Sequence, residues 1–216
     1  MDMRVYNVKG DGHCYYRCIW NIAKNYPLIA EALMINDKDD EAEGAGEVRY
    51  YVALSLRFKE IYAVNIVRNL VALYKDLPDI VDMYPILNHI KYIDAPIDQI
   101  CVELSHVIEN TNVMASSLEH EIIAERLSND TLDPPLDCKL VVLAQLDGEN
   151  VDDLADKWLR QLDAAICKVE NEYVVIIINQ DNIHYKYAKI FGEHMVRTNT
   201  LREYIKDKME CSTDSD

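Results

Sequence analysis

Residues 10–26 read Gly-Asp-Gly-His-Cys-Tyr-Tyr-Arg-Cys-Ile-Trp-Asn-Ile-Ala-Lys-Asn-Tyr, a glycine-rich turn that runs directly into a helical pattern. Apolar side chains recur at positions 15, 18, 19, 22 and 23, which lie on one face of a helix. Cys14 therefore stands where the turn meets the helix. Backbone N–H groups and the positive end of a helix both favour a thiolate at such a place. The stretch predicts a reactive cysteine at the start of a helix.

A second motif, Asn182-Ile183-His184-Tyr185, lies near the other end of the chain. If a strand begins at Asn182, the side chains of Asn182 and His184 share one face of it, and the amide oxygen can accept the Nδ1–H of the imidazole. Nε2 would then face a thiol, as in hydrolases that use cysteine, histidine and asparagine. The two motifs together predict a cysteine hydrolase.

The glycines of the first motif have two interpretations. Gly10 and Gly12 allow conformations that a side chain would forbid, and they expose N–H groups that could bind the oxyanion of an acyl transfer. The alternative is an ordinary turn into a helix, with Asp11 as its cap. Cys18, one helical turn after Cys14, leaves open a redox or metal protein. No second pair of ligands stands at metal spacing, so we expect no metal and no cofactor.

Composition and charge argue against some classes of function. The chain has 216 residues and a net charge of −16, which argues against nucleic-acid binding because such binding depends on a basic surface. No apolar run is long enough to span a membrane, and residues 1–6 lack the apolar segment of a signal peptide. The six cysteines are scattered, so we expect a reducing, cytoplasmic location. A monomer is the default for a small protease.

Helical patterns dominate the first half, and strands come late, which predicts an α+β fold with a small central sheet sandwiched by helices. Residues 1–209 are expected to form a single domain, followed by a polar, frayed tail over 210–216. Helices are expected over 15–26, 47–74 (as one or two), 79–92, 97–109, 116–128, 151–168 and 199–209; strands over 139–146, 173–179 and 184–190; an acidic loop over 37–47 and a turn over 129–135.

Residues 10–19 resemble the catalytic-cysteine motif of the ovarian-tumour (OTU) family of cysteine deubiquitinases, which is close to Gly-Asp-Gly-Asn-Cys-Leu-Phe-Arg-Ala-Ile. Residues 182–185 are similar to the family's terminal histidine motif, in which an asparagine stands two before the histidine and an aromatic residue follows. The likeness is weaker over 47–53 and over 116–124, where the family's Trp-Gly pair is missing. The resemblance implies an OTU-like fold of the papain superfamily.

The resemblance also implies isopeptide hydrolysis at the C-terminal glycine of ubiquitin, polyubiquitin chains or a ubiquitin-like modifier. Cys14 matches the nucleophile, His184 the general base and acid, and Asn182 the residue that orients the histidine. Tyr185 matches the aromatic residue after the histidine and is assigned to substrate binding. The residues whose backbone matches the oxyanion hole are Asp11, Gly12, His13 and Cys14.

Two positions depart from the family pattern. His13 replaces the asparagine before the cysteine, and Lys186 stands where some members carry an acidic orienting residue. Asn182 must therefore orient the histidine, with Asp181 as the fallback. A catalytically weak fold that only binds ubiquitin is the alternative function.

The acidic surface, including the 37–47 loop, could steer the arginines around the tail of ubiquitin. Richness in Ile, Asn, Asp, Lys and Tyr is typical of AT-rich genomes such as those of viruses or intracellular pathogens. For such a source the expected location is the host cytoplasm.

Overall fold

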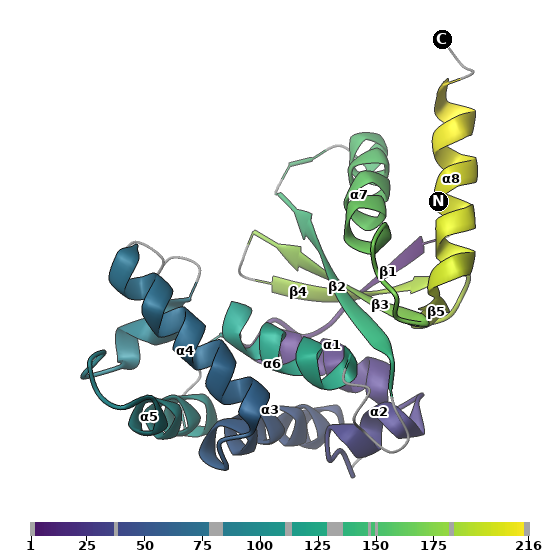
Figure 1. The fold of residues 1–216 in the computed structure, drawn as a ribbon. Helices are drawn as coiled ribbons and strands as arrows, with labels where there is room; N and C mark the ends of the chain where they lie inside the picture. Colours follow the sequence, from purple (N-terminus) through teal and green to yellow (C-terminus); the bar gives the residue numbers. More distant parts are fainter. Residues whose placement is uncertain are drawn as a thin grey trace. The chain divides into compact units, whose positions relative to one another are not determined.

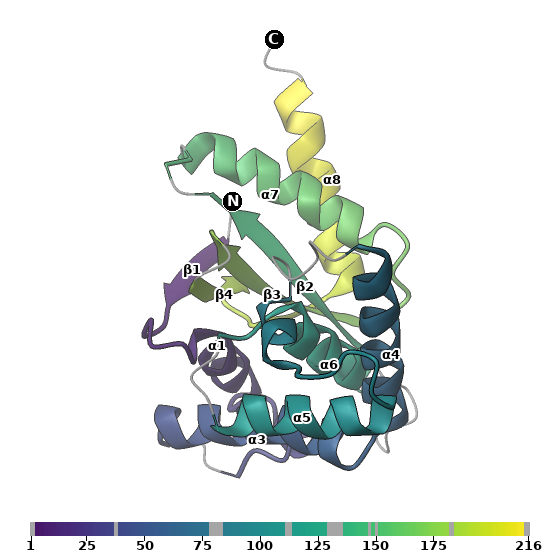
Figure 2. The same ribbon diagram turned by 90° about the vertical axis from the view of Figure 1, so that its left-hand side faces the viewer.

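The computed structural model describes residues 3–36, 39–77, 84–110, 114–128, 136–146, 148–149, 151–181 and 184–213. These residues form an α+β fold with a mixed five-stranded sheet (Figures 1 and 2). They group into two compact units. The sheet unit comprises Met1–Gly10 and Leu127–Asp216, and the helical unit comprises Asp11–Arg126.

The sheet unit has the strand order β1-β4-β3-β2, with β5 paired to β3. Strands β2 and β3 are parallel and joined through a helix, whereas the other pairs are antiparallel. The strands are β1 Met3–Asn7, β2 Cys138–Gln145, β3 Tyr173–Gln180, β4 His184–Ile190 and β5 Met195–Arg197. The expected strands β2, β3 and β4 are confirmed. Strands β1 and β5 were not expected, because both are short and acquire their hydrogen bonds only from distant partners.

Helices α7 (Val151–Ile166) and α8 (Thr198–Thr213) cover one face of this sheet (Figure 1). Every second residue of β3 faces them, and Trp158 of α7 also donates its indole N–H to the carbonyl of Ala144, 3.1 Å away. The main apolar side chains in this core are Val141, Leu143, Leu154, Trp158, Leu162, Ile166, Val174, Ile176, Ile178, Ala188, Ile190, Leu201 and Ile205. The unbroken apolar run of β3 follows from burial of both its faces.

The C-terminal tail is shorter than expected. Helix α8 continues through Thr213 instead of ending near residue 209. Residues 210–213 contain neither glycine nor proline, so nothing in the sequence ends the helix there. Residues 214–216 lie outside the described part of the chain.

The helical unit is built around α1 (Cys14–Ala23), all ten residues of which are buried. Helix α3 packs against both α1 and α5, and α4 also contacts α5. The remaining elements are α2 Pro27–Ala32, α3 Glu41–Arg57, α4 Ile61–Asp76, the 3₁₀ helix η2 Pro85–His89, α5 Ile97–Asn110 and α6 Ser117–Ser128, whose last residues fall beyond the unit boundary. The helices expected at 15–26, 97–109 and 116–128 are confirmed, the first with an end at Ala23.

The acidic loop expected over 37–47 is wrong for most of its length, because α3 already begins at Glu41. The side chain of Asp40 caps this helix by accepting hydrogen bonds from the N–H groups of Ala42 and Glu43, at 2.7 and 3.1 Å. Acidic residues in the first turn of a helix also interact favourably with the helix dipole. Residues 37–38 lie outside the described part.

The helical pattern over 47–74 is two helices, which separate where Lys59 adopts a left-handed φ of 57°. Of the helix expected over 79–92, the described residues show only η2. Residues 78–83 lie outside the described part, as does the turn expected over 129–135.

Candidate active site

Cys14 is the first residue of α1, as expected, and directly follows a left-handed turn at Gly12 with φ of 79°. Glycine adopts that conformation most readily, because it has no Cβ. The carbonyl of His13 accepts the N–H of Arg17 at 2.9 Å and starts the helical hydrogen bonding. The Cys14 side chain is buried in this structure, with 3% of its surface exposed. The turn thus delivers the thiol to the N-terminal end of a buried helix.

Asp11 and Arg17 form an ion pair that closes this turn. Oδ2 of Asp11 lies 2.7 Å from Nη2 of Arg17, and Oδ1 accepts from Nε at 3.3 Å. The hydrogen bond from Arg17 is the main cause that lowers the pKa of Asp11 to about 2. Oδ1 also accepts the N–H of His13 at 3.2 Å. The carboxylate therefore stabilises the turn itself.

The hydrogen bond from His13 to Asp11 involves one of the N–H groups of the expected oxyanion hole. Because His13 directs its N–H to Oδ1 of Asp11, this donor already has a protein acceptor. The other N–H groups in the expected set are those of Asp11, Gly12 and Cys14. Their role in binding an oxyanion stays a prediction.

His184 is the first residue of β4, in the sheet unit. Strand β1 pairs antiparallel with β4, with Asn7 opposite Lys186, so the chain after β1 runs toward His184. Gly10 lies against the imidazole: a Cβ built on Gly10 would be 3.5 Å from Nδ1 and 3.7 Å from Cε1. Gly10 does not adopt a left-handed φ, which corrects the expectation of special backbone freedom there. A methyl group at this position would make ordinary van der Waals contact with the ring, so the backbone of Gly10 lies close to the histidine.

The surroundings of His184 lower the pKa of its imidazole. Burial is the larger cause, and the positive charge of Lys186 on the same face of β4 is the second. Lys186 also donates to Oε1 of Gln145 at 3.3 Å, which holds the ammonium group beside β2. The neutral imidazole is therefore favoured, and this is the form that can accept a proton.

The other residues predicted to act beside His184 are Asn182, Asp181 and Tyr185. Asn182 lies outside the described residues, so its orienting role stays a prediction. Asp181, the fallback, has a left-handed φ of 53° and donates its N–H to the carbonyl of Gln145 at 3.0 Å. Tyr185 is 4% exposed, and its hydroxyl accepts from Nδ2 of Asn179 at 3.5 Å. This burial places the Tyr185 ring in the packing of β4, and substrate binding by it stays a prediction.

Cys18 is fully buried one turn after Cys14, and burial raises the pKa of its thiol well above the ordinary value. A thiolate, the form that binds metal or reacts, is therefore disfavoured there. Among the described residues, no three His, Cys, Asp or Glu side chains come together as a metal site.

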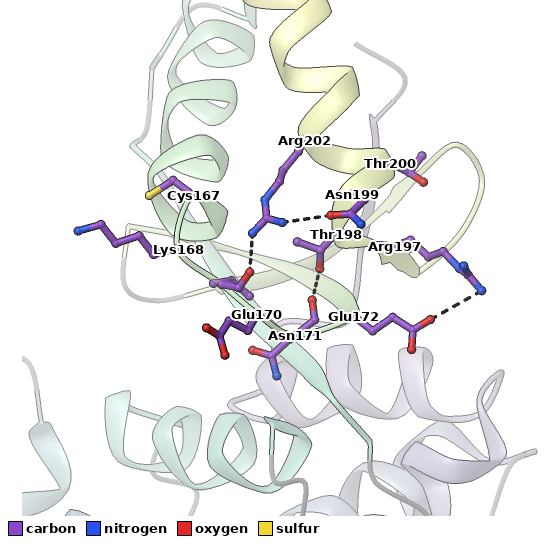
Figure 3. Close-up of a pocket in the computed structure, with 11 residues that line it drawn as sticks. Cys167, Lys168, Glu170, Asn171, Glu172, Arg197, Thr198, Asn199, Thr200 and Arg202 are labelled. Atoms are coloured by element: carbon purple, nitrogen blue, oxygen red, sulfur yellow. Dashed lines mark hydrogen bonds and ion pairs between the residues drawn. The ribbon is translucent and has the colours of Figure 1, made fainter.

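A pocket of about 770 Å³ lies elsewhere in the sheet unit, where α7 ends and α8 begins (Figure 3). Arg202 donates to the carbonyls of Ile166 and Val169, which satisfies the C-terminal end of α7. Thr198 donates its hydroxyl to the carbonyl of Asn171 at 2.6 Å. The polar lining thus joins two helix ends, and the pocket includes no residue of either motif.

Comparison of the chain with family models, curated proteins and solved structures gives no match. Within the described ranges, no helix has the length and apolar character needed to cross a membrane.

Two features near the motifs were missed in the sequence. One is β1, whose pairing with β4 brings Gly10 to His184; alternation over residues 3–7 is the weak signal that it offers. The other is the buried Arg49 of α3, which lies 3.2 Å from the ring of His13 and has no signal in local sequence.

Proposed function

We propose that this protein is a cysteine hydrolase of the OTU type that cleaves isopeptide bonds at the C-terminal glycine of ubiquitin or a ubiquitin-like modifier. The observation that supports it most is the approach of Gly10, which opens the cysteine motif, to the imidazole of His184. The two residues are far apart in sequence, yet each belongs to a motif that resembles the same family. Cys14 follows Gly10 by four positions.

In this proposal, Sγ of Cys14 attacks the carbonyl carbon of the terminal glycine, and the thiol proton passes to Nε2 of His184. Backbone N–H groups of the Asp11–Cys14 turn bind the oxyanion. The isopeptide C–N bond then breaks, and the leaving lysine amine takes the proton from His184. Water hydrolyses the thioester by the reverse sequence of proton transfers, which restores the thiol. Asn182 would orient the imidazole.

Two local features support these roles. The lowered pKa of His184 keeps the imidazole neutral and able to act as a base. The N-terminal end of α1 favours negative charge on Cys14. The acidic chain, with its net charge of −16, also suits a basic partner such as the arginine-bearing tail of ubiquitin.

The test is reaction of the full chain with ubiquitin that carries an electrophile at its C-terminus. We expect the wild-type protein to gain the mass of one ubiquitin, and Cys14→Ala to gain none. Cys18→Ala is the matched control and should react like the wild type, because its thiol is not part of the proposed chemistry and its raised pKa disfavours the thiolate. His184→Ala should react far more slowly.

An adduct on Cys14→Ala would show that the nucleophile is wrongly assigned. The absence of any adduct on the wild type would contradict the hydrolase proposal. A ubiquitin titration would then test the alternative, a module that binds ubiquitin without cleaving it.

A further inference from the structure

His13, directly before the proposed nucleophile, uses its side chain in an unusual way. It occupies the N-cap position of α1, where a side chain ordinarily accepts a hydrogen bond from the first turn, yet it makes no such bond. Its Nε2 instead lies 3.2 Å from Nη1 of Arg49 on α3. The ring therefore joins the cysteine turn to another helix.

The direction of this hydrogen bond follows from the chemistry of arginine. A guanidinium keeps its protons at all ordinary pH values and can only donate. Nε2 of His13 must therefore accept, which makes the ring neutral with its proton on Nδ1. An acceptor at this position is what the Arg49 contact requires.

Arg49 is itself fixed by several elements of the helical unit. It is 5% exposed, and its Nε donates to the carbonyl of Ile108 in the last turn of α5. Its guanidinium carbon lies 5.5 Å from the ring centre of Tyr16 on α1. The hydroxyl of Tyr16 donates to the buried Glu119 of α6 at 3.4 Å. A guanidinium held in this way has little freedom, so it can define the position of whatever it binds.

We infer that Arg49 and His13 form a positioning pair that fixes the backbone of the turn carrying Cys14. His13 is then held twice, through its ring by Arg49 and through its N–H by Asp11. The inference rests on the proposed function, because a fixed turn matters if Cys14 is the nucleophile and the turn binds an oxyanion. In this scheme the pair acts through the backbone of the turn.

The test compares His13→Leu, which removes the acceptor, with His13→Gln, whose amide oxygen can reach a similar position. Both are assayed as full chains on ubiquitin with a fluorogenic C-terminal amide. We expect His13→Leu to lower kcat about 10-fold or more, with KM within about 2-fold, because a small displacement of a reacting group slows chemistry. His13→Gln should recover most of kcat. Melting temperatures should stay within a few degrees, which separates positioning from loss of fold.

Arg49→Lys gives an independent variant if His13→Leu does not fold. Lysine keeps the charge but cannot hold Ile108 and His13 at once with a fork of donors. We expect a similar loss of kcat, and no further loss when His13→Leu is added, because the two residues act as one unit. Wild-type kcat in His13→Leu, no recovery in His13→Gln, or additive losses would each overturn the pair.

Failure of the proposed function can be distinguished from failure of the positioning pair. If the wild-type protein cleaves no ubiquitin substrate, the pair is still tested by the rate at which iodoacetamide alkylates Cys14. A slower or faster rate in His13→Leu, with the wild-type rate restored in His13→Gln, supports the positioning pair. Equal rates in all three proteins overturn it.

Discussion

The two motifs are held in place by different means. The cysteine turn in the helical unit is fixed by side chains, with Asp11 bound to Arg17 and His13 bound to Arg49. The histidine in the sheet unit is positioned by backbone pairing of β4 with β1 and β3, and Gly10 packs against its ring. Polar substitutions should therefore disturb the cysteine turn most, whereas added bulk should disturb the histidine most.

The largest expected effect tests the histidine side. Gly10→Val places branched bulk against the His184 ring, and we expect kcat to fall about 100-fold because a displaced base cannot reach its proton. Gly10→Ala is the matched control. Its Cβ would meet Nδ1 at 3.5 Å, an ordinary van der Waals distance, so kcat should stay within about 3-fold of wild type. Equal kcat values for the two variants, from steady-state assays on a fluorogenic ubiquitin substrate, would contradict the proposed packing role.

The next effect concerns the packing of α1 against α3 in the helical unit. A Cβ on Gly44 of α3 would overlap the buried indole of Trp20 on α1, so Gly44→Ala should lower the free energy of unfolding by about 1–3 kcal/mol. Gly46 lies in the same helix with open space around it, and Gly46→Ala should raise that free energy by about 0.5–1 kcal/mol. Urea unfolding of both variants measures the difference. Destabilisation by both would contradict the specific contact with Trp20.

A smaller effect is expected for the ion pair in the cysteine turn. Asp11→Asn keeps an acceptor but removes the charge that binds Arg17, and we expect kcat to fall about 3- to 10-fold through loosening of the turn. Glu41→Gln is the control, because Glu41 lies farther from Arg17, at 3.5 Å, and is more exposed. It should leave kcat unchanged. If kcat falls as much in Glu41→Gln as in Asp11→Asn, then kcat depends on negative charge near Arg17 in general and not on the hydrogen bonds of Asp11 in the turn.

The pH dependence of this ion pair follows from the lowered pKa of Asp11. A carboxyl group whose pKa is lower in the folded protein stabilises the fold above its unfolded pKa, and the contribution is lost as pH falls through the folded value. For Asp11 that loss is completed near pH 2. The ion pair should therefore remain intact from pH 5 to pH 9, and NMR titration of the Asp11 carboxyl checks this.

The smallest effect is a change in the pKa of His184. Lys186→Gln removes a nearby positive charge that disfavours the imidazolium, so the pKa should rise toward the ordinary value while burial still keeps it lowered. Proton NMR titration in a Cys14→Ala background measures it without interference from the thiol. Lys189→Gln, on the opposite face of β4, should leave it unchanged. An unchanged pKa in Lys186→Gln would exclude the charge of Lys186 as a cause.

Local sequence determined the elements that carry the motifs. The step from glycines to an apolar helical pattern located Cys14 at the start of α1, and the apolar runs located β2 and β3. These features depend on residues within a few positions of one another, so the sequence reveals them. The prediction failed over 41–46, where the acidic stretch indicated a loop although Asp40 caps a helix and Gly44 makes room for Trp20.

Tertiary structure alone decided what surrounds each motif. The approach of Gly10 to His184 depends on the register of β1 on β4, and the contact of Arg49 with His13 depends on the packing of α3 against α1. Both join residues far apart in the chain, so local sequence does not specify either contact. The sequence therefore locates the residues that we propose for the chemistry, whereas the contacts around them arise only when the distant segments pack together.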